Sequence, residues 1–118
     1  MNRRAKLLQS KVKAQAPRVL ELNEGVYDVA SATSGTRYRV LNHWRGGYMC
    51  ECEWSKWHDT RTMPCTHVLA VEEHRARQHA RRLSLWACAE DAQRQHRPVE
   101  QVGVGLYATS RKAEARAA

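Results

Sequence analysis

The sequence predicts a small α+β domain in which a short antiparallel β-meander leads, through a cysteine knuckle, into an α-helix. Three observations favour this fold class. The chain has 118 residues, which suffices for one domain and is too short for two cores of ordinary size. Short runs of alternating apolar residues, separated by turn residues, fill its first half. An apolar patch at helical spacing follows Pro64, at Val68, Leu69 and Val71.

Residues 1–17 are expected to form a basic N-terminal arm, with a short helix over residues 4–16. The helix should stop before Pro17, because proline disfavours the helical conformation of the residue that precedes it. Large apolar residues are few in this segment, so we expect the helix to dock weakly. Six cationic residues occur before the first acid of the chain: Arg3, Arg4, Lys6, Lys11, Lys13 and Arg18.

The meander comes next, in three strands separated by turn residues. We expect these strands over Arg18–Leu22, Val26–Ser31 and Arg37–Leu41. Gly46 and Gly47 then free the backbone ahead of the first cysteine pair. A polar loop with Trp54 and Trp57 follows, up to Pro64.

The predicted helix from Thr66 becomes almost wholly polar beyond Glu73 and is expected to run on to Arg82. Residues Leu83–Ala87 are expected to form a short apolar segment that separates this helix from the next one. A short helix over Glu90–Gln95, a hairpin of Val99–Val102 with Leu106–Ser110, and a disordered tail over residues 111–118 complete the expected elements.

The decisive pattern is Cys50-x-Cys52, then twelve residues, then Cys65-x-His67. Zinc prefers four soft or borderline ligands at tetrahedral corners, and three thiolates with one imidazole form such a closed set. Residues two apart on a regular strand lie about 6.6 Å from each other. Cys50 and Cys52 can therefore share one ion only if the strand bends sharply there. Residues two apart on a helix point about 200° apart. Cys65 should therefore lie just outside the helix and His67 in its first turn, with Thr66 as a possible N-cap.

Three further Cys and His residues are candidate metal ligands. His43 and His58 lie close in sequence, but neither repeats the paired spacing, and histidines in polar loops are usually exposed. Cys88, the fourth cysteine, has apolar neighbours and is expected to be a buried small hydrophobe. The interpretation that all four pattern residues are incidental is weak, because three of only four cysteines fall in two matched pairs.

The pattern C-x-C-x(n)-C-x-H, after a strand pair and before a helix, resembles the SWIM zinc finger. The resemblance covers approximately Tyr38 to Val71, including Tyr48-Met49-Cys50-Glu51-Cys52 and Met63-Pro64-Cys65-Thr66-His67. It implies a ββα-type site for one structural Zn²⁺, in a zinc-binding domain over residues 18–110 with its finger core at 38–82. Proteins with this finger take part in DNA transactions as transposases, chromatin remodellers or recombination accessory factors. Here the finger dominates the chain, and no transposase-like or helicase-like domain accompanies it.

Charge favours an anionic partner, because the formal net charge is +8. The sequence predicts a module that binds nucleic acid, DNA in the first place, in recombination, transposition or the biology of phages and mobile elements. Phosphate contacts are expected from the Arg-rich helix and the arm, and Trp57 could stack on an unpaired base. The candidate residues are Arg75, Arg77, Arg81, Arg82, Lys11, Lys13 and Trp57. The alternative is an adaptor whose zinc knuckle binds a recombinase or transposase, with the arginines as a solvated face.

Other function classes find little support in the sequence. A closed four-ligand zinc has no open position to activate water, and no glycine-rich phosphate loop or small-molecule site is apparent, so we expect no enzyme activity. No apolar run approaches the roughly 18–20 residues that cross a bilayer, and no signal peptide is visible. We therefore expect a reducing cytoplasm, with a nucleoid-associated or phage-encoded protein as possibilities, and there cysteines more often bind metal than pair.

Overall fold

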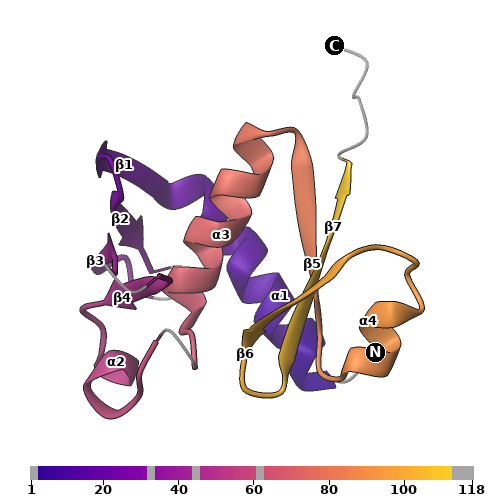
Figure 1. The fold of residues 1–118 in the computed structure, drawn as a ribbon. Coiled ribbons are helices and arrows are strands. Elements are labelled where there is room, and N and C mark those ends of the chain that lie inside the picture. Colours follow the sequence, from indigo (N-terminus) through magenta and orange to yellow (C-terminus); the bar gives the residue numbers. More distant parts are fainter. Residues whose placement is uncertain (1–2, 32–33, 44–45, 61–62, 113–118) are drawn as a thin grey trace.

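The computed structural model describes residues 3–31, 34–43, 46–60 and 63–112. Its central element is helix α3 (Thr66–Gln78), which has a four-stranded sheet on one side and a three-stranded sheet on the other (Figure 1). Helix α1 (Arg3–Gln15) packs against α3 and the second sheet. The predicted α+β class is confirmed.

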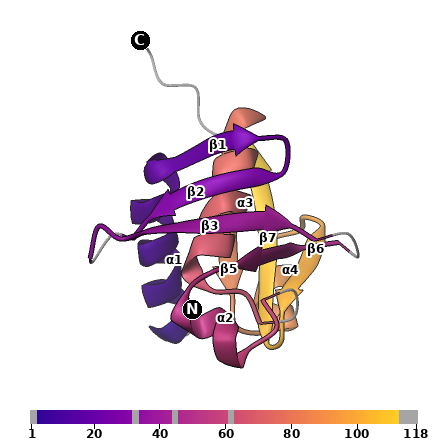
Figure 2. The ribbon, with the colours of Figure 1, turned by 90° about the vertical axis from the view of Figure 1, so that its left-hand side faces the viewer.

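The first sheet is antiparallel in the order β1-β2-β3-β4, so the predicted meander is confirmed and gains a fourth strand. One face of this sheet packs on α3 and the opposite face is turned away from it (Figure 2). Tyr27, Val29 and Val40 are buried on the α3 side because side chains alternate along a strand. The strands are β1 (Val19–Asn23), β2 (Val26–Ala30), β3 (Arg37–Asn42) and β4 (Tyr48–Cys50).

Helix α3 begins at Thr66, as predicted, but ends at Gln78 and does not continue to Arg82. The chain reverses at Ala80, whose φ of 55° is left-handed, and enters strand β5 (Arg81–Trp86). Arg81 and Arg82 therefore lie on a strand, and the prediction that they share a helix with Arg75 and Arg77 is wrong. The reason is that residues 81–86 pair with a distant strand, which overrides their helical propensity.

The second sheet has the order β5-β7-β6. Strands β6 (Val99–Gly103) and β7 (Leu106–Lys112) form the predicted hairpin, and β7 reaches two residues into the segment expected to be a tail. The predicted apolar break at Leu83–Ala87 is instead most of β5. Residues 113–118 lie outside the described part of the chain.

Three short helical segments complete the fold. A 3-10 turn, η1 (Ala16–Arg18), links α1 to β1. Helix α2 (Glu53–Trp57) replaces the polar loop expected there, and α4 (Ala89–Gln93) lies where the short helix was predicted. No helix in the described ranges is both long and apolar enough to cross a membrane.

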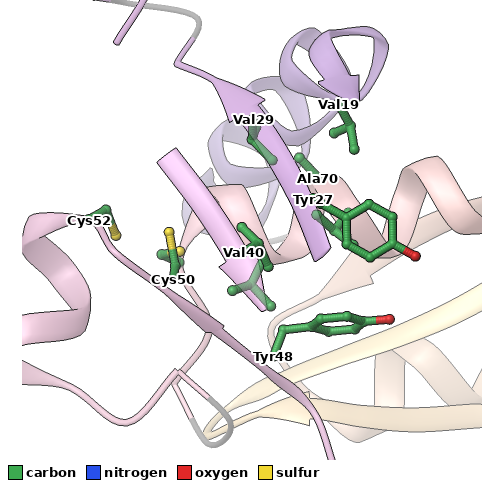
Figure 3. Close-up of a cluster of buried hydrophobic side chains, with 11 residues drawn as sticks. Val19, Tyr27, Val29, Val40, Tyr48, Cys50, Cys52 and Ala70 are labelled. Atoms are coloured by element: carbon green, nitrogen blue, oxygen red, sulfur yellow. The ribbon is translucent and has the colours of Figure 1, made fainter. Parts of the chain in front are cut away.

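Two hydrophobic clusters lie on the two sides of α3. The first joins that helix to the four-stranded sheet and includes the three cysteines of the sequence pattern (Figure 3). The second consists of Val12 of α1, Leu69 of α3, and Leu85 and Ala108 of the second sheet. The N-terminal helix is thus part of the packed structure, since it contributes a core residue and Gln9 accepts a hydrogen bond from the Leu85 N–H.

Candidate metal centre

The first ligand pair lies where strand β4 gives way to helix α2. Cys50 is the last residue of β4, and Cys52 is the N-cap of α2 with φ −82° and ψ 171°. The expected sharp bend is therefore a strand end followed at once by a helix. The Ser55 N–H and hydroxyl both donate to the Cys52 carbonyl, at 3.1 and 2.7 Å, and hold this turn.

The second pair lies at the start of α3. Cys65 is the N-cap, with φ −81° and ψ 172°, and His67 lies in the first turn, as predicted. Thr66 is the first helical residue and not the N-cap. Cys52 and Cys65 thus have nearly the same backbone conformation, each directly ahead of a helix, and this repeated arrangement directs both sulfurs to one point.

All four side chains are buried, and their ligand atoms lie within 4.8 Å of one another. His67 Nδ1 is 3.7 Å from the Cys50 sulfur and 3.8 Å from the Cys65 sulfur. In a tetrahedral zinc site the sulfur-to-nitrogen edge is about 3.6 Å, from bond lengths of about 2.3 and 2.05 Å. The cluster could therefore hold one metal ion with little rearrangement.

The cysteines influence one another's ionisation. A hydrogen bond between Cys50 and Cys65 raises the pKa of Cys50, and burial raises it further. The same hydrogen bond lowers the pKa of Cys65 to about 4, and His67 and the Val68 N–H act in the same direction. Burial raises the pKa of Cys52. Negative charge therefore concentrates at Cys65, and a divalent cation among the sulfurs would stabilise all three thiolates.

The cluster packs against strand β3 and the first hydrophobic cluster. The Tyr38 ring lies 4.6 Å from the His67 ring, centroid to centroid, and covers it from strand β3. Figure 3 shows Cys50 and Cys52 at one end of the first hydrophobic cluster and Tyr48 at the other. An ion here would be joined to the main core.

The other candidate ligands named from the sequence lie outside the cluster. The His58 ring stacks on Trp54, with centroids 3.9 Å apart, and neither His58 nor His43 belongs to the cluster. Cys88 is exposed at the N-cap of α4, so the prediction that it is buried is wrong. Its apolar neighbours are only half-buried because β5 ends there. Within the described ranges, no other group of three or more Cys, His, Asp or Glu residues lies close enough for a metal.

Strand pairing in the second sheet brings four cationic residues together. The register of β5 with β7 places Arg81 opposite Lys112 and Arg82 opposite Arg111. We call these four residues the cationic end. Arg111 and Lys112 were not predicted as contacts, because residues 111–118 were expected to be a disordered tail, whereas β7 runs to Lys112.

Arg75 and Arg77, by contrast, have structural partners. Arg75 donates from Nη1 to the Tyr48 hydroxyl, and its guanidinium lies 5.9 Å from the centroid of that ring. Arg77 pairs through Nε with Glu73, at 3.2 Å. These two arginines hold α3 in place and are less free for a ligand than the sequence suggested.

The remaining predicted contacts are divided between two places. Lys13 lines a cavity of about 380 Å³ together with Arg75 and Arg81, and that cavity also contains Glu72, Glu73 and Glu100. Lys11 lines a different groove, beside the metal cluster. Trp57 is 81% exposed at the end of α2, and α2 lies at the opposite end of the molecule from the cationic end (Figure 1). The predicted residues therefore do not form one continuous surface.

The fold and the cluster define a small α+β protein with a buried Cys₃His site compatible with a zinc finger. No family model, no curated protein and no solved structure matches the chain. The similarity to the SWIM finger therefore depends on the ligand pattern and on the strand–helix arrangement around it.

Proposed function

We propose that the protein is a zinc-stabilised module that binds nucleic acid, with DNA as the first candidate, and that it has no catalytic role. Zinc is favoured by the donor set, because three sulfurs and one imidazole suit Zn²⁺ better than the oxygen-preferring cations. His67 would bind through Nδ1, the nitrogen that faces the sulfurs. A set of four protein ligands leaves no open position for water or substrate, as expected of a structural site.

The metal would join three elements that share few other contacts. Cys50 ends β4, Cys52 begins α2, and Cys65 and His67 begin α3. Structural zinc in finger peptides contributes an apparent binding free energy of about 10–16 kcal/mol. A chain of this size has a thin core, so a contribution of that order would account for much of its stability.

The cationic end is the observation that supports nucleic-acid binding. Two cross-strand pairs, Arg81 with Lys112 and Arg82 with Arg111, place like charges opposite each other. Such pairs destabilise a sheet unless an anion lies between them. Arg82, Arg111 and Lys112 form no ion pair with any described residue. A phosphate backbone would relieve this repulsion.

Contacts of this kind are made to phosphates and do not read base sequence. The proposal is therefore a backbone binder with little sequence preference. An accessory role in recombination, transposition or the biology of mobile elements follows from the resemblance to the SWIM finger, and a cytoplasmic or nucleoid location would accompany it.

Fluorescence anisotropy with labelled single- and double-stranded DNA, across a salt series, tests the proposal. If four phosphates are neutralised, the logarithm of affinity should fall with that of salt at a slope of about −3.6 on duplex DNA. The variant Arg82→Glu/Arg111→Glu should lose most of the binding. The control Arg39→Glu/Arg97→Glu changes the net charge by the same amount at exposed sites outside β5 and β7. Equal losses in both variants, or binding that salt leaves unchanged, would contradict the proposal.

A further inference from the structure

A large groove lies beside the metal cluster, between α1, the segment from α2 to α3, and the turn from β6 to β7. Its volume is about 1030 Å³. In Figure 1 these three segments meet at the lower end of the molecule, and the cationic end lies at the upper end, where β5 begins and β7 finishes. The residues that give the groove its character are Leu7, Leu8, Trp54, Pro64, Val104 and Leu106.

Two apolar side chains on the rim of the groove have no packing role in the fold. Leu7 is 58% exposed, although its neighbour Leu8 packs on the second core. Val104 is 71% exposed at the tip of the β6–β7 turn. That turn needs a left-handed residue, which Gly105 supplies with φ 65°, but nothing in it requires valine. Exposed apolar residues gathered around one groove are typical of an interaction site.

The shape and chemistry of the groove favour a protein segment over a small molecule. Its volume is at the upper limit of small-molecule pockets, about 300–1,000 Å³. Three residues of the metal cluster, Cys52, Cys65 and His67, form part of its lining together with Tyr38. Its other polar lining residues are Lys11, Glu53 and Thr66. Leu7 and Val104 are among its lining residues and remain largely exposed to water. A helix laid along the groove would cover them.

Charge indicates the composition of this segment. Helix α1 contains no acidic residue, and its exposed Lys6 and Lys11 lie on either side of Leu7 and Leu8 along the helix. The net charge of +8 opposes association with a second copy of the chain. Complementarity therefore points to a partner that carries carboxylates beside its apolar anchors.

We propose that the groove binds an acidic amphipathic helix of a partner protein, whose large apolar side chains enter between Leu7 and Val104. This site is independent of the cationic end, because the two lie at opposite ends of the molecule (Figure 1). A module with both could hold nucleic acid and a protein at the same time. The two roles predicted from the sequence, adaptor and nucleic-acid binder, would then be compatible.

The test uses the full chain and a fluorescent 18-residue peptide with leucines at helical positions i, i+3, i+4 and i+7 and glutamates on the flanks. A peptide of equal composition, with its leucines spread around the helix, is the peptide control. Leu7→Glu and Val104→Glu should each weaken binding at least about tenfold, as expected for central anchors. Leu20→Glu is the matched protein control, because Leu20 is 54% exposed on β1, away from the groove.

Several outcomes would overturn the proposal. Equal weakening by Leu20→Glu, or equal binding of the scrambled peptide, would show non-specific adhesion. A dimer in light scattering that Leu7→Glu abolishes would assign the groove to a second copy. Arg82→Glu/Arg111→Glu should leave peptide binding within about twofold of the parent protein. That variant separates a failure of the groove proposal from a failure of the nucleic-acid proposal, since only DNA binding depends on the cationic end.

Discussion

The sulfur of Cys50 lies 3.7 Å from Nδ1 of His67, although 17 positions separate the two residues in the chain. One residue ends a strand and the other lies in the first turn of a helix. The distance between these two atoms therefore depends on how the first sheet packs against α3. Any change that separates these two atoms should affect both metal binding and the fold.

Replacing Cys50 or Cys65 with serine should abolish stoichiometric metal binding, because a hydroxyl is a poor zinc ligand beside thiolates. Elemental analysis of purified protein should find one zinc per chain in the parent and far less in either variant. Cys88→Ser is the matched control, because Cys88 is exposed and outside the cluster. A zinc content that falls equally in Cys88→Ser would contradict the ligand assignment.

Removing the metal with a strong chelator at neutral pH should loosen one side of the molecule more than the other. The three cysteines belong to the cluster between α3 and the first sheet, whereas the second cluster contains no ligand. Hydrogen exchange read by mass spectrometry should show lost protection in β4, α2 and the first turn of α3. The strands β5 and β7 should keep more of theirs. Native exchange throughout after chelation would rule out a structural metal.

Glu73→Ala should destabilise the fold by about 2–4 kcal/mol, because it leaves buried groups without a partner. Glu73 is 1% exposed, and its carboxylate accepts the Leu83 N–H at 2.9 Å and Arg77 Nε at 3.2 Å. It thus connects the end of α3 to the start of β5. Urea denaturation should show the loss, and Glu73→Gln, which keeps an acceptor oxygen, should lose less. An alanine variant as stable as the parent would show that these bonds contribute little.

Glu72→Gln should make stability less dependent on pH. Burial raises the pKa of Glu72, and Glu100 adds to this effect while Arg75 opposes it. A carboxyl whose pKa is raised on folding binds its proton more tightly in the folded state, so stability falls as pH rises through its two pKa values. The variant should be more stable than the parent near neutral pH and show little difference below pH of about 4.

Denaturation midpoints of the parent and the variant, measured in parallel from acid to neutral pH, check this prediction. A difference that grows toward acid, or that is constant across the series, would contradict the sign argued for Glu72. The same series with Glu90→Gln serves as a control, because Glu90 is exposed on α4.

The metal cluster and the meander could be predicted from the sequence because their signals are local. The ligand pairs are each spaced by one residue, and turn residues separate the short strands. The position of Cys65 just outside α3, with His67 in the first turn, followed from helical geometry alone. The nearly identical conformation at Cys52 did not, since only the observed helix α2 reveals it.

In the second sheet the β6–β7 hairpin was predicted, whereas strand β5 was missed for a physical reason. The stretch from His74 to Arg82 contains neither glycine nor proline, so nothing local ends the helix before β5. The left-handed turn at Ala80 is stable only because residues 81–86 find β7, some 20 to 30 positions further along. Cys88 was misjudged in the same way, since its exposure depends on where β5 ends.

The sequence by itself determined the chemistry of this protein: which four side chains can share an ion, and that the chain carries excess positive charge. Ligand type and spacing are properties of residues close together in the chain, so they can be recognised without knowledge of the fold. Only the tertiary structure decided how that charge is grouped, with Arg82 facing Arg111, and that an apolar groove opens at the other end. Both depend on strand pairing between distant residues, whose free energy is gained only when the whole core has assembled.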